Sequence, residues 1–236
     1  MGLYFRQLLS GRDFATGDQL ARQMRNFCYL VGDTETGEAV VVDPAYDIDD
    51  LLRIAGEDGM ELVGALATHY HPDHIGGSMM GYQLQGIAEL LEHTQIPVHV
   101  QAAEAEFVTK VSSVGDEDLI IHDGSSTLTV GNIPIELIHC PGHTPGSQTF
   151  LVDGHFLGGD TLFIDGCGRT DLPGGDAGEL YTTLTSRLAH VPDDAVLFPG
   201  HLYSAEPCQS MGDTRKYNMV FAPKTAEQWL MMFGQV

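Results

Sequence analysis

The feature that most constrains this chain is a histidine- and aspartate-rich segment, Thr68–Gly77, that directly follows a short apolar run, Leu62–Ala67. Imidazole nitrogens and carboxylate oxygens are ligands that suit zinc, iron and manganese. Four such side chains lie within six consecutive residues: His69, His71, Asp73 and His74. In an extended segment, residues two apart project to the same side. The spacing therefore predicts two metal positions, with His69 and His71 at the first and Asp73 and His74 at the second.

Three further candidate ligands follow apolar runs in the same way. Pro-Gly turns place His143 after Ile133–Ile138 and His201 after Ala195–Leu197, and two glycines place Asp160 after Phe156-Leu157. Turns at strand ends commonly carry functional side chains on a rigid scaffold. We therefore predict one metal-dependent active site with seven ligands. The other histidines are expected to be surface or packing residues: His93, His99, His122, His139, His155 and His190.

The pattern along the chain predicts a mixed α/β fold with two sheets and helices on their outer faces. No linker is evident, so we expect one domain over residues 1–236. Strands are expected at Tyr4–Leu9, Phe27–Val31, Glu38–Val42, Leu62–Ala67, Val98–Val100, Ser126–Val130, Ile133–Ile138, Gln148–Val152, His155–Leu157 and Ala195–Phe198. Helices are expected at Ile48–Ala55, Met79–Leu91, Ala102–Val111, Ala177–Leu188 and Thr225–Phe233.

Composition limits the partners. The formal net charge is −22, which repels phosphate backbones and argues against nucleic acid. It is read either as a soluble acidic surface or as adaptation to high salt. No apolar run approaches the roughly 20 residues that span a bilayer, and the N-terminus lacks signal-peptide features. We expect a cytoplasmic protein with reduced cysteines and no membrane partner; a homodimer is compatible with the sequence.

The order His-x-His-x-Asp-His after a strand, followed by a distant His, Asp and His, resembles the metallo-β-lactamase-fold superfamily over nearly the whole chain. The resemblance implies an αββα sandwich of two mixed sheets flanked by helices. It implies that His69, His71 and His143 hold one metal, that Asp73, His74 and His201 hold another, and that Asp160 bridges them. It also implies that Asp43, at the end of a strand, orients one of the ligands.

The segment from Gly159 to Arg169 is similar to the corresponding run of glyoxalase II and of the persulfide dioxygenases. In both groups a basic residue after Gly-Cys-Gly helps to bind glutathione, and Arg169 matches it. Tyr203 matches a glutathione-contacting tyrosine of glyoxalase II. Arg215 lies in a tail that resembles the compact tail of the dioxygenases and of short glyoxalase II-like proteins. The resemblance thus implies a small anionic, thiol-derived substrate such as a glutathione conjugate, bound by Arg169, Tyr203 and Arg215.

Two activities follow from this resemblance. We predict a hydrolase of thioesters or esters that uses two divalent metal ions, zinc first and iron or manganese next, and a metal-bound hydroxide. Asp73 would be catalytic, orienting the nucleophile or moving a proton. The alternative is a persulfide dioxygenase with a single Fe(II) held by two histidines and a carboxylate. Metal content and oxygen consumption separate the two.

Overall fold

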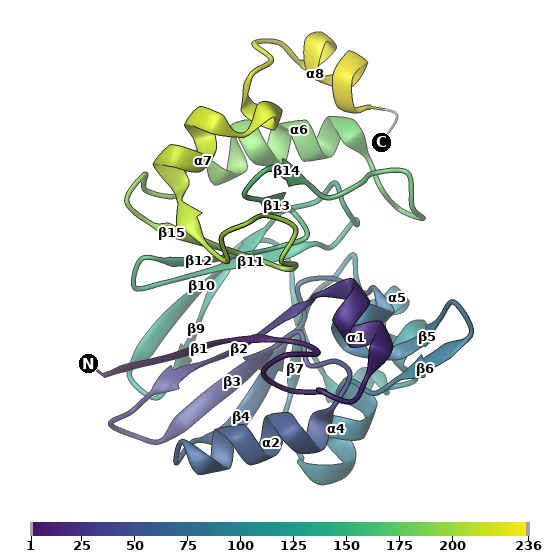
Figure 1. Cartoon of the computed structure of the whole chain (residues 1–236), viewed down its shortest axis with the longest axis vertical. Coiled ribbons are helices and arrows are strands. Elements are labelled where there is room, and N and C mark those ends of the chain that lie inside the picture. Colours follow the sequence, from purple (N-terminus) through teal and green to yellow (C-terminus); the bar gives the residue numbers. More distant parts are fainter. Residues whose placement is uncertain (1, 235–236) are drawn as a thin grey trace.

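A computed structural model describes residues 2–234 of the chain. It contains two six-stranded mixed sheets (Figure 1). In the first sheet β1–β2 and β2–β3 pair antiparallel and the other three pairs are parallel, whereas in the second only β12–β15 is parallel. In spatial order, the first sheet is β1 (Leu3–Leu9), β2 (Phe27–Asp33), β3 (Glu38–Val42), β4 (Glu61–Leu66), β7 (Val98–Gln101) and β8 (Leu119–His122). The second is β16 (Gln209–Ser210), β15 (Val196–Pro199), β12 (His155–Gly159), β11 (Gln148–Val152), β10 (Ile133–His139) and β9 (Ser126–Val130).

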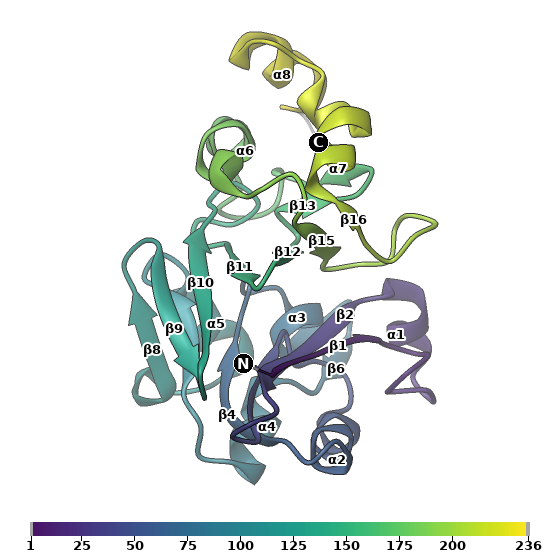
Figure 2. The same ribbon diagram turned by 90° about the vertical axis from the view of Figure 1, so that its left-hand side faces the viewer.

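Helices cover the outer face of each sheet, as Figures 1 and 2 show. On the first sheet lie α1 (Gln19–Met24), α2 (Ile48–Glu57), α4 (Ile87–His93) and α5 (Ala105–Ser112). On the second lie α6 (Ala177–Thr185) and α7 (Met211–Tyr217), and α8 (Ala226–Phe233) packs on the far side of α6 through Trp229 and Tyr181. Short 3-10 helices occupy Asp116–Asp118, Arg187–His190 and Met219–Phe221.

Three clusters of buried side chains correspond to the three contacts between these four layers. The middle cluster joins the two sheets, with Tyr29, Val42 and Leu66 from one and Leu137 and Phe150 from the other. The outer clusters join each sheet to its helices. Alternate residues of a strand point to opposite faces, so each sheet can bury both. The predicted αββα sandwich is confirmed.

One predicted element is wrong. Met79–Leu91 is not a helix: it begins as a hairpin of β5 (Gly77–Met79) and β6 (Tyr82–Leu84), and α4 starts only at Ile87. Met80 and Gly81 at the turn have φ values of 52° and 84°. A helix cannot continue through left-handed residues, and this two-residue turn suits a hairpin.

Candidate metal centre

The seven predicted ligands come together at one edge of the sandwich. Each lies just beyond a strand: the Thr68–Gly77 segment follows β4, His143 follows β10, Asp160 follows β12 and His201 follows β15. Within the first segment, a short helix α3 (Pro72–Ile75) begins directly after His71, with proline at its first position. Proline is favoured there because its fixed φ suits a helix start. This turn directs His69 and His71 to one group of ligands and Asp73 and His74 to the next.

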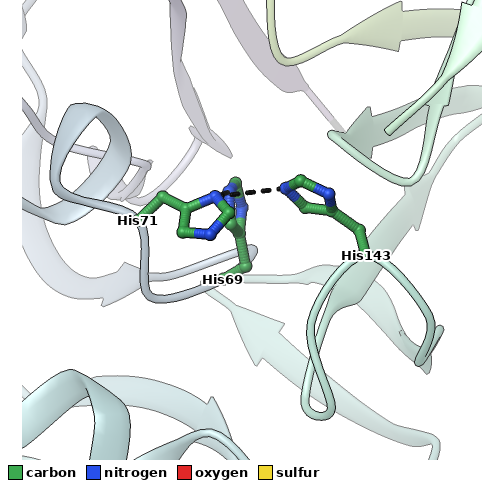
Figure 3. A group of neighbouring side chains, drawn as sticks. All are labelled: His69, His71 and His143. Atoms are coloured by element: carbon green, nitrogen blue, oxygen red, sulfur yellow. Dashed lines mark hydrogen bonds between the residues drawn. The ribbon is translucent and has the colours of Figure 1, made fainter. Parts of the chain in front are cut away.

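The first ligand group contains three histidines, drawn in Figure 3. Nδ1 of His71 lies 2.9 Å from Nε2 of His69 and 3.2 Å from Nε2 of His143. The far nitrogen of His143 donates to the carbonyl of Arg169 at 2.7 Å, and that of His69 lies 2.9 Å from the Thr68 hydroxyl. Such outer contacts fix a histidine's tautomer and ring orientation, which leaves the inward nitrogen free to bind a metal.

The second group contains Asp73, His74 and His201. Nε2 of His74 lies 3.2 Å from Nε2 of His201, and Oδ2 of Asp73 lies 3.6 and 3.4 Å from those two nitrogens. His74 donates through Nδ1 to Asp43, and His201 donates through Nδ1 to the Met24 carbonyl, both at 2.8 Å. Both inward nitrogens are therefore directed at one point.

Asp160 lies between the two groups. Its Oδ1 is 3.4 Å from His74 Nε2, and its Oδ2 is 3.4 Å from His201 Nε2 and 3.7 Å from His143 Nε2. Oδ1 is buried without a hydrogen-bond partner among the described residues. A buried carboxylate oxygen with no donor is costly. A cation would satisfy it, so the donor set fits two metal ions that share Asp160.

Charge is distributed unequally over the two groups in the metal-free protein. Burial lowers the pKa of His69, of His143 and of His71, the last to about 4. Burial also lowers the pKa of His74, but the carboxylates of Asp160, Asp73 and Asp43 outweigh it and raise that pKa to about 10. At pH 7 the histidines of the first group are thus uncharged, whereas His74 in the second group carries a hydrogen on both ring nitrogens and is positively charged.

This difference predicts unequal pH dependence of metal binding. A cation entering the second group must displace the proton of His74, and its affinity should fall about tenfold from pH 8 to pH 7 for each proton released. The first group needs no proton loss in this range, so its affinity should hardly change. Chelator-competition titration measures both. As a control, His201→Ala should leave one nearly pH-independent site; equal pH slopes at both sites would contradict the assignment.

Asp43 links the first sheet to the second ligand group. Its Oδ1 accepts from the Thr68 amide, and its Oδ2 accepts from the Thr68 hydroxyl and from His74 Nδ1, at 2.7 to 2.8 Å. Asp43 has φ 52°, a left-handed conformation that asparagine and aspartate tolerate better than most residues. The structure thus places Asp43 where it can orient His74.

Asp43→Asn is expected to weaken binding of the second metal about 10- to 100-fold, the usual effect of losing such an outer contact. The asparagine keeps the backbone conformation, but its amide group would favour the tautomer of His74 that puts the hydrogen on Nε2, the metal-facing nitrogen. Metal titration measures the affinity, and circular dichroism checks that the backbone fold is kept. Asp49→Asn, on the exposed side of α2, is the matched control. Unchanged affinity would show that Asp43 does not act through His74.

Two buried residues at the centre were not predicted. Asn26 lies just before β2; its Nδ2 is 3.1 Å from Asp73 Oδ2, and its Oδ1 accepts from the Tyr46 hydroxyl at 2.8 Å. Glu104 lies just before α5 and accepts hydrogen bonds from the segments on either side of the first ligand group: from Tyr70 N, Thr144 Oγ1 and Gly146 N. Burial raises the pKa of Glu104 to about 7 against these donors.

A cavity of about 680 Å³ opens over the metal ligands. Two of the three residues for which we predict substrate binding, Arg169 and Tyr203, line it. Tyr203 stacks on His201 with ring centres 4.6 Å apart. Arg215 does not line the cavity: it lies on α7, pairs with Asp193 and donates to the carbonyls of Leu188 and Val191. These contacts give Arg215 a role in packing the second sheet's helices rather than in binding a ligand.

The αββα layers and two ligand groups that share a carboxylate at their edge define a class of metal-dependent enzymes. The chain belongs to the metallo-beta-lactamase superfamily, whose family model matches residues 22–201. No helix in the described part of the chain has the length and apolar character needed to cross a membrane.

The chain is similar both to persulfide dioxygenases and to hydroxyacylglutathione hydrolases. The human mitochondrial persulfide dioxygenase ETHE1 is 33% identical over 221 residues, covering 90% of this chain and 80% of that protein. A hydroxyacylglutathione hydrolase of a Polaromonas species is 34% identical over 182 residues, covering 76% and 63%. The crystal structure of ETHE1 from Myxococcus xanthus superposes with a TM-score of 0.80 at 27% identity, covering 98% of this chain and 90% of that one.

Proposed function

We propose that this protein is a metal-dependent hydrolase of thioesters or esters, similar in reaction to the hydroxyacylglutathione hydrolases. The observation that carries the proposal is the pair of complete ligand groups that share Asp160 on the floor of one cavity. A single metal held by His69, His143 and Asp160 would leave four candidate ligands without a metal to bind: His71, Asp73, His74 and His201. The similarity to the Polaromonas enzyme supports the same reaction class.

His69, His71 and His143 would hold one divalent ion and Asp73, His74 and His201 the other, with zinc expected first and iron or manganese next. Such ions, when bound, supply Lewis acidity and lower the pKa of water so that it can attack at neutral pH. Asn26 holds the Asp73 carboxylate, which is placed to orient the attacking water or accept its proton. In the overall reaction water adds to the acyl carbon and the C–S bond breaks, yielding a carboxylic acid and a thiol.

Arg169 and Tyr203 would bind the thiol part of the substrate, which we propose to be small and anionic, as in a glutathione conjugate. Arg169 is exposed and lies at the cavity, where its guanidinium makes two 2.6 Å hydrogen bonds with Asp171. Guanidinium groups recognise carboxylates by this paired geometry.

Arg169→Ala should raise KM for S-lactoylglutathione about tenfold, because the substrate loses a charge-assisted contact. Metal content should not change, since the side chain binds no ligand residue. Steady-state kinetics and metal analysis provide the measurement. Arg187→Ala removes an exposed arginine that pairs with Glu179 outside the cavity, and is the matched control. An unaltered KM in Arg169→Ala would remove this residue from the substrate site.

A second candidate, a persulfide dioxygenase, is favoured by the near full-length similarity to ETHE1 in both sequence and structure. His69, His143 and Asp160 would supply the two histidines and one carboxylate that suit non-haem iron oxygenases. Glutathione persulfide would be the substrate.

Metal analysis of anaerobically purified protein, together with two assays, distinguishes the candidates. The hydrolase should contain about two metal ions per chain and turn over S-lactoylglutathione. About one iron per chain, with oxygen consumed on glutathione persulfide, would instead establish the dioxygenase.

A further inference from the structure

The β5–β6 hairpin forms an apolar wall of the cavity. Met79, the last residue of β5, and Met80, in the turn, both line it. Met80 is 80% exposed, although methionine is an apolar residue. The β13–β14 hairpin (Leu162–Phe163 and Gly166–Cys167) lines the same cavity from the other half of the molecule (Figure 1). The metal ligands therefore lie in a cavity whose walls come from two hairpins.

The apolar character extends beyond the β5–β6 hairpin. Met24, at the end of α1, also lines the cavity, and Phe163 and Leu172 contribute from the second half. Methionine is unbranched and polarisable, so it adapts to ligands of varied shape. Exposed apolar side chains grouped around a cavity are typical of a ligand-binding surface.

The β5–β6 wall of the cavity carries no arginine or lysine. Arg169 is the one arginine or lysine among the described residues that line the cavity, and it follows β14 in the opposite half. Its guanidinium is already bonded to Asp171. The β5–β6 wall thus offers no positive charge to an anionic group and suits an uncharged, apolar one.

We infer that the substrate carries an uncharged, apolar acyl chain that lies against Met79 and Met80, and that this hairpin determines acyl specificity. The inference rests on the proposed hydrolase, because it assigns the acyl and thiol parts of one thioester to different walls. A hydrocarbon chain gains affinity with each methylene group that it buries. The cavity should therefore favour a medium-length acyl chain over an acetyl or lactoyl group.

Binding of thioethers that cannot be hydrolysed tests this inference. S-octyl-N-acetylcysteamine and S-methyl-N-acetylcysteamine share a neutral carrier, so Arg169 does not affect the comparison. With zinc-loaded protein, calorimetry should show the octyl compound binding about thirtyfold more tightly, for partial burial of the seven extra methylene groups. Met80→Gln and Met79→Gln should each lower this ratio several-fold. Met231→Gln, which changes a methionine 75% exposed on α8, should leave it unchanged.

Equal affinity for the two thioethers, or an octyl preference that survives both hairpin substitutions, would overturn the inference. Because Met80 is exposed at a turn, Met80→Gln is expected to fold normally, which thermal unfolding checks. Failure of the proposed function has a different signature. If no thioester is hydrolysed but the octyl preference and its loss in Met80→Gln are observed, the hydrolase proposal fails and the apolar subsite stands.

Discussion

Replacing Asp160 by asparagine is expected to lower kcat/KM for thioester hydrolysis at least about a thousandfold. The Asp160 carboxylate oxygens lie 3.4 to 3.7 Å from histidine nitrogens of both ligand groups. An asparagine offers a single neutral oxygen and turns a donor group toward the other metal position. Loss of metal-assisted charge stabilisation costs several kcal/mol, and about 1.4 kcal/mol corresponds to a factor of ten in rate.

Metal analysis of the same variant should show fewer than two ions per chain, because the shared ligand is lost. Asp165→Asn is the matched control: Asp165 lines the cavity and is exposed, but it belongs to neither ligand group. It should retain its metals and most of its activity. Full turnover and full metal content in Asp160→Asn would rule out a bridging role for Asp160.

The clustering of the seven candidate ligands could be predicted because each of them carries a local signal. His143 and His201 follow apolar strands through Pro-Gly turns, and the Thr68–Gly77 segment follows β4. An apolar run followed by a tight turn encodes both the strand and the point where its side chains become available. The pattern of strands and helices predicted two sheets with helices outside, and the resemblance of the histidine motifs to a known superfamily specified the αββα sandwich.

The β5–β6 hairpin could not be predicted from periodicity alone. Met80, Leu84, Ile87 and Leu91 have helical spacing, and the last two do belong to α4. The pattern is therefore right for the second half of the segment and wrong for the first. Gly81 and Gly86 are the local signal against one continuous helix, because glycine disfavours a helix interior. Close packing of Gly86 against Ile75, which leaves no room for a Cβ, is a tertiary contact that the sequence does not reveal.

Asn26 and Glu104 could not be predicted from the sequence for a different reason. Asn26 is 47 residues from Asp73, and Glu104 is 34 residues from Tyr70 and 40 from Thr144. Neither stands in a motif, so only the packing of distant segments brings them to the centre. A buried carboxylate whose partners are two backbone amides and a hydroxyl is nevertheless conspicuous in the structure, since buried charges are normally paired with a cation.

Glu104→Leu is expected to lower the free energy of unfolding by about 2 to 5 kcal/mol, since it leaves two buried backbone amides without an acceptor and each costs about 1 to 3 kcal/mol. These donors are Tyr70 N and Gly146 N, both 2.7 Å from the carboxylate; the third donor, Thr144 Oγ1, also lies 2.7 Å from the Ser147 hydroxyl, which can accept its hydrogen. Tyr70 lies between two ligands and Thr144 directly follows a third. Loss of Glu104 should therefore also weaken the first metal position. Urea unfolding of metal-free protein and metal titration measure the two effects separately.

If Glu104→Leu does not fold, Glu104→Gln can still show whether Glu104 positions the metal ligands or only stabilises the fold. Glutamine has nearly the same shape, but its NH2 group cannot accept a hydrogen bond and would face at least one of the groups that donate to Glu104. It should fold, lose about 1 to 3 kcal/mol of stability and bind the first metal at least about tenfold more weakly. The comparison is made at pH 8, above the raised pKa of Glu104, where the carboxylate is ionised. Glu106→Gln is the matched control, because Glu106 is an exposed residue in the first turn of α5 that pairs with Lys110. If Glu104→Gln loses stability but keeps wild-type affinity at the His69, His71 and His143 position, then Glu104 supports the fold without positioning the metal ligands.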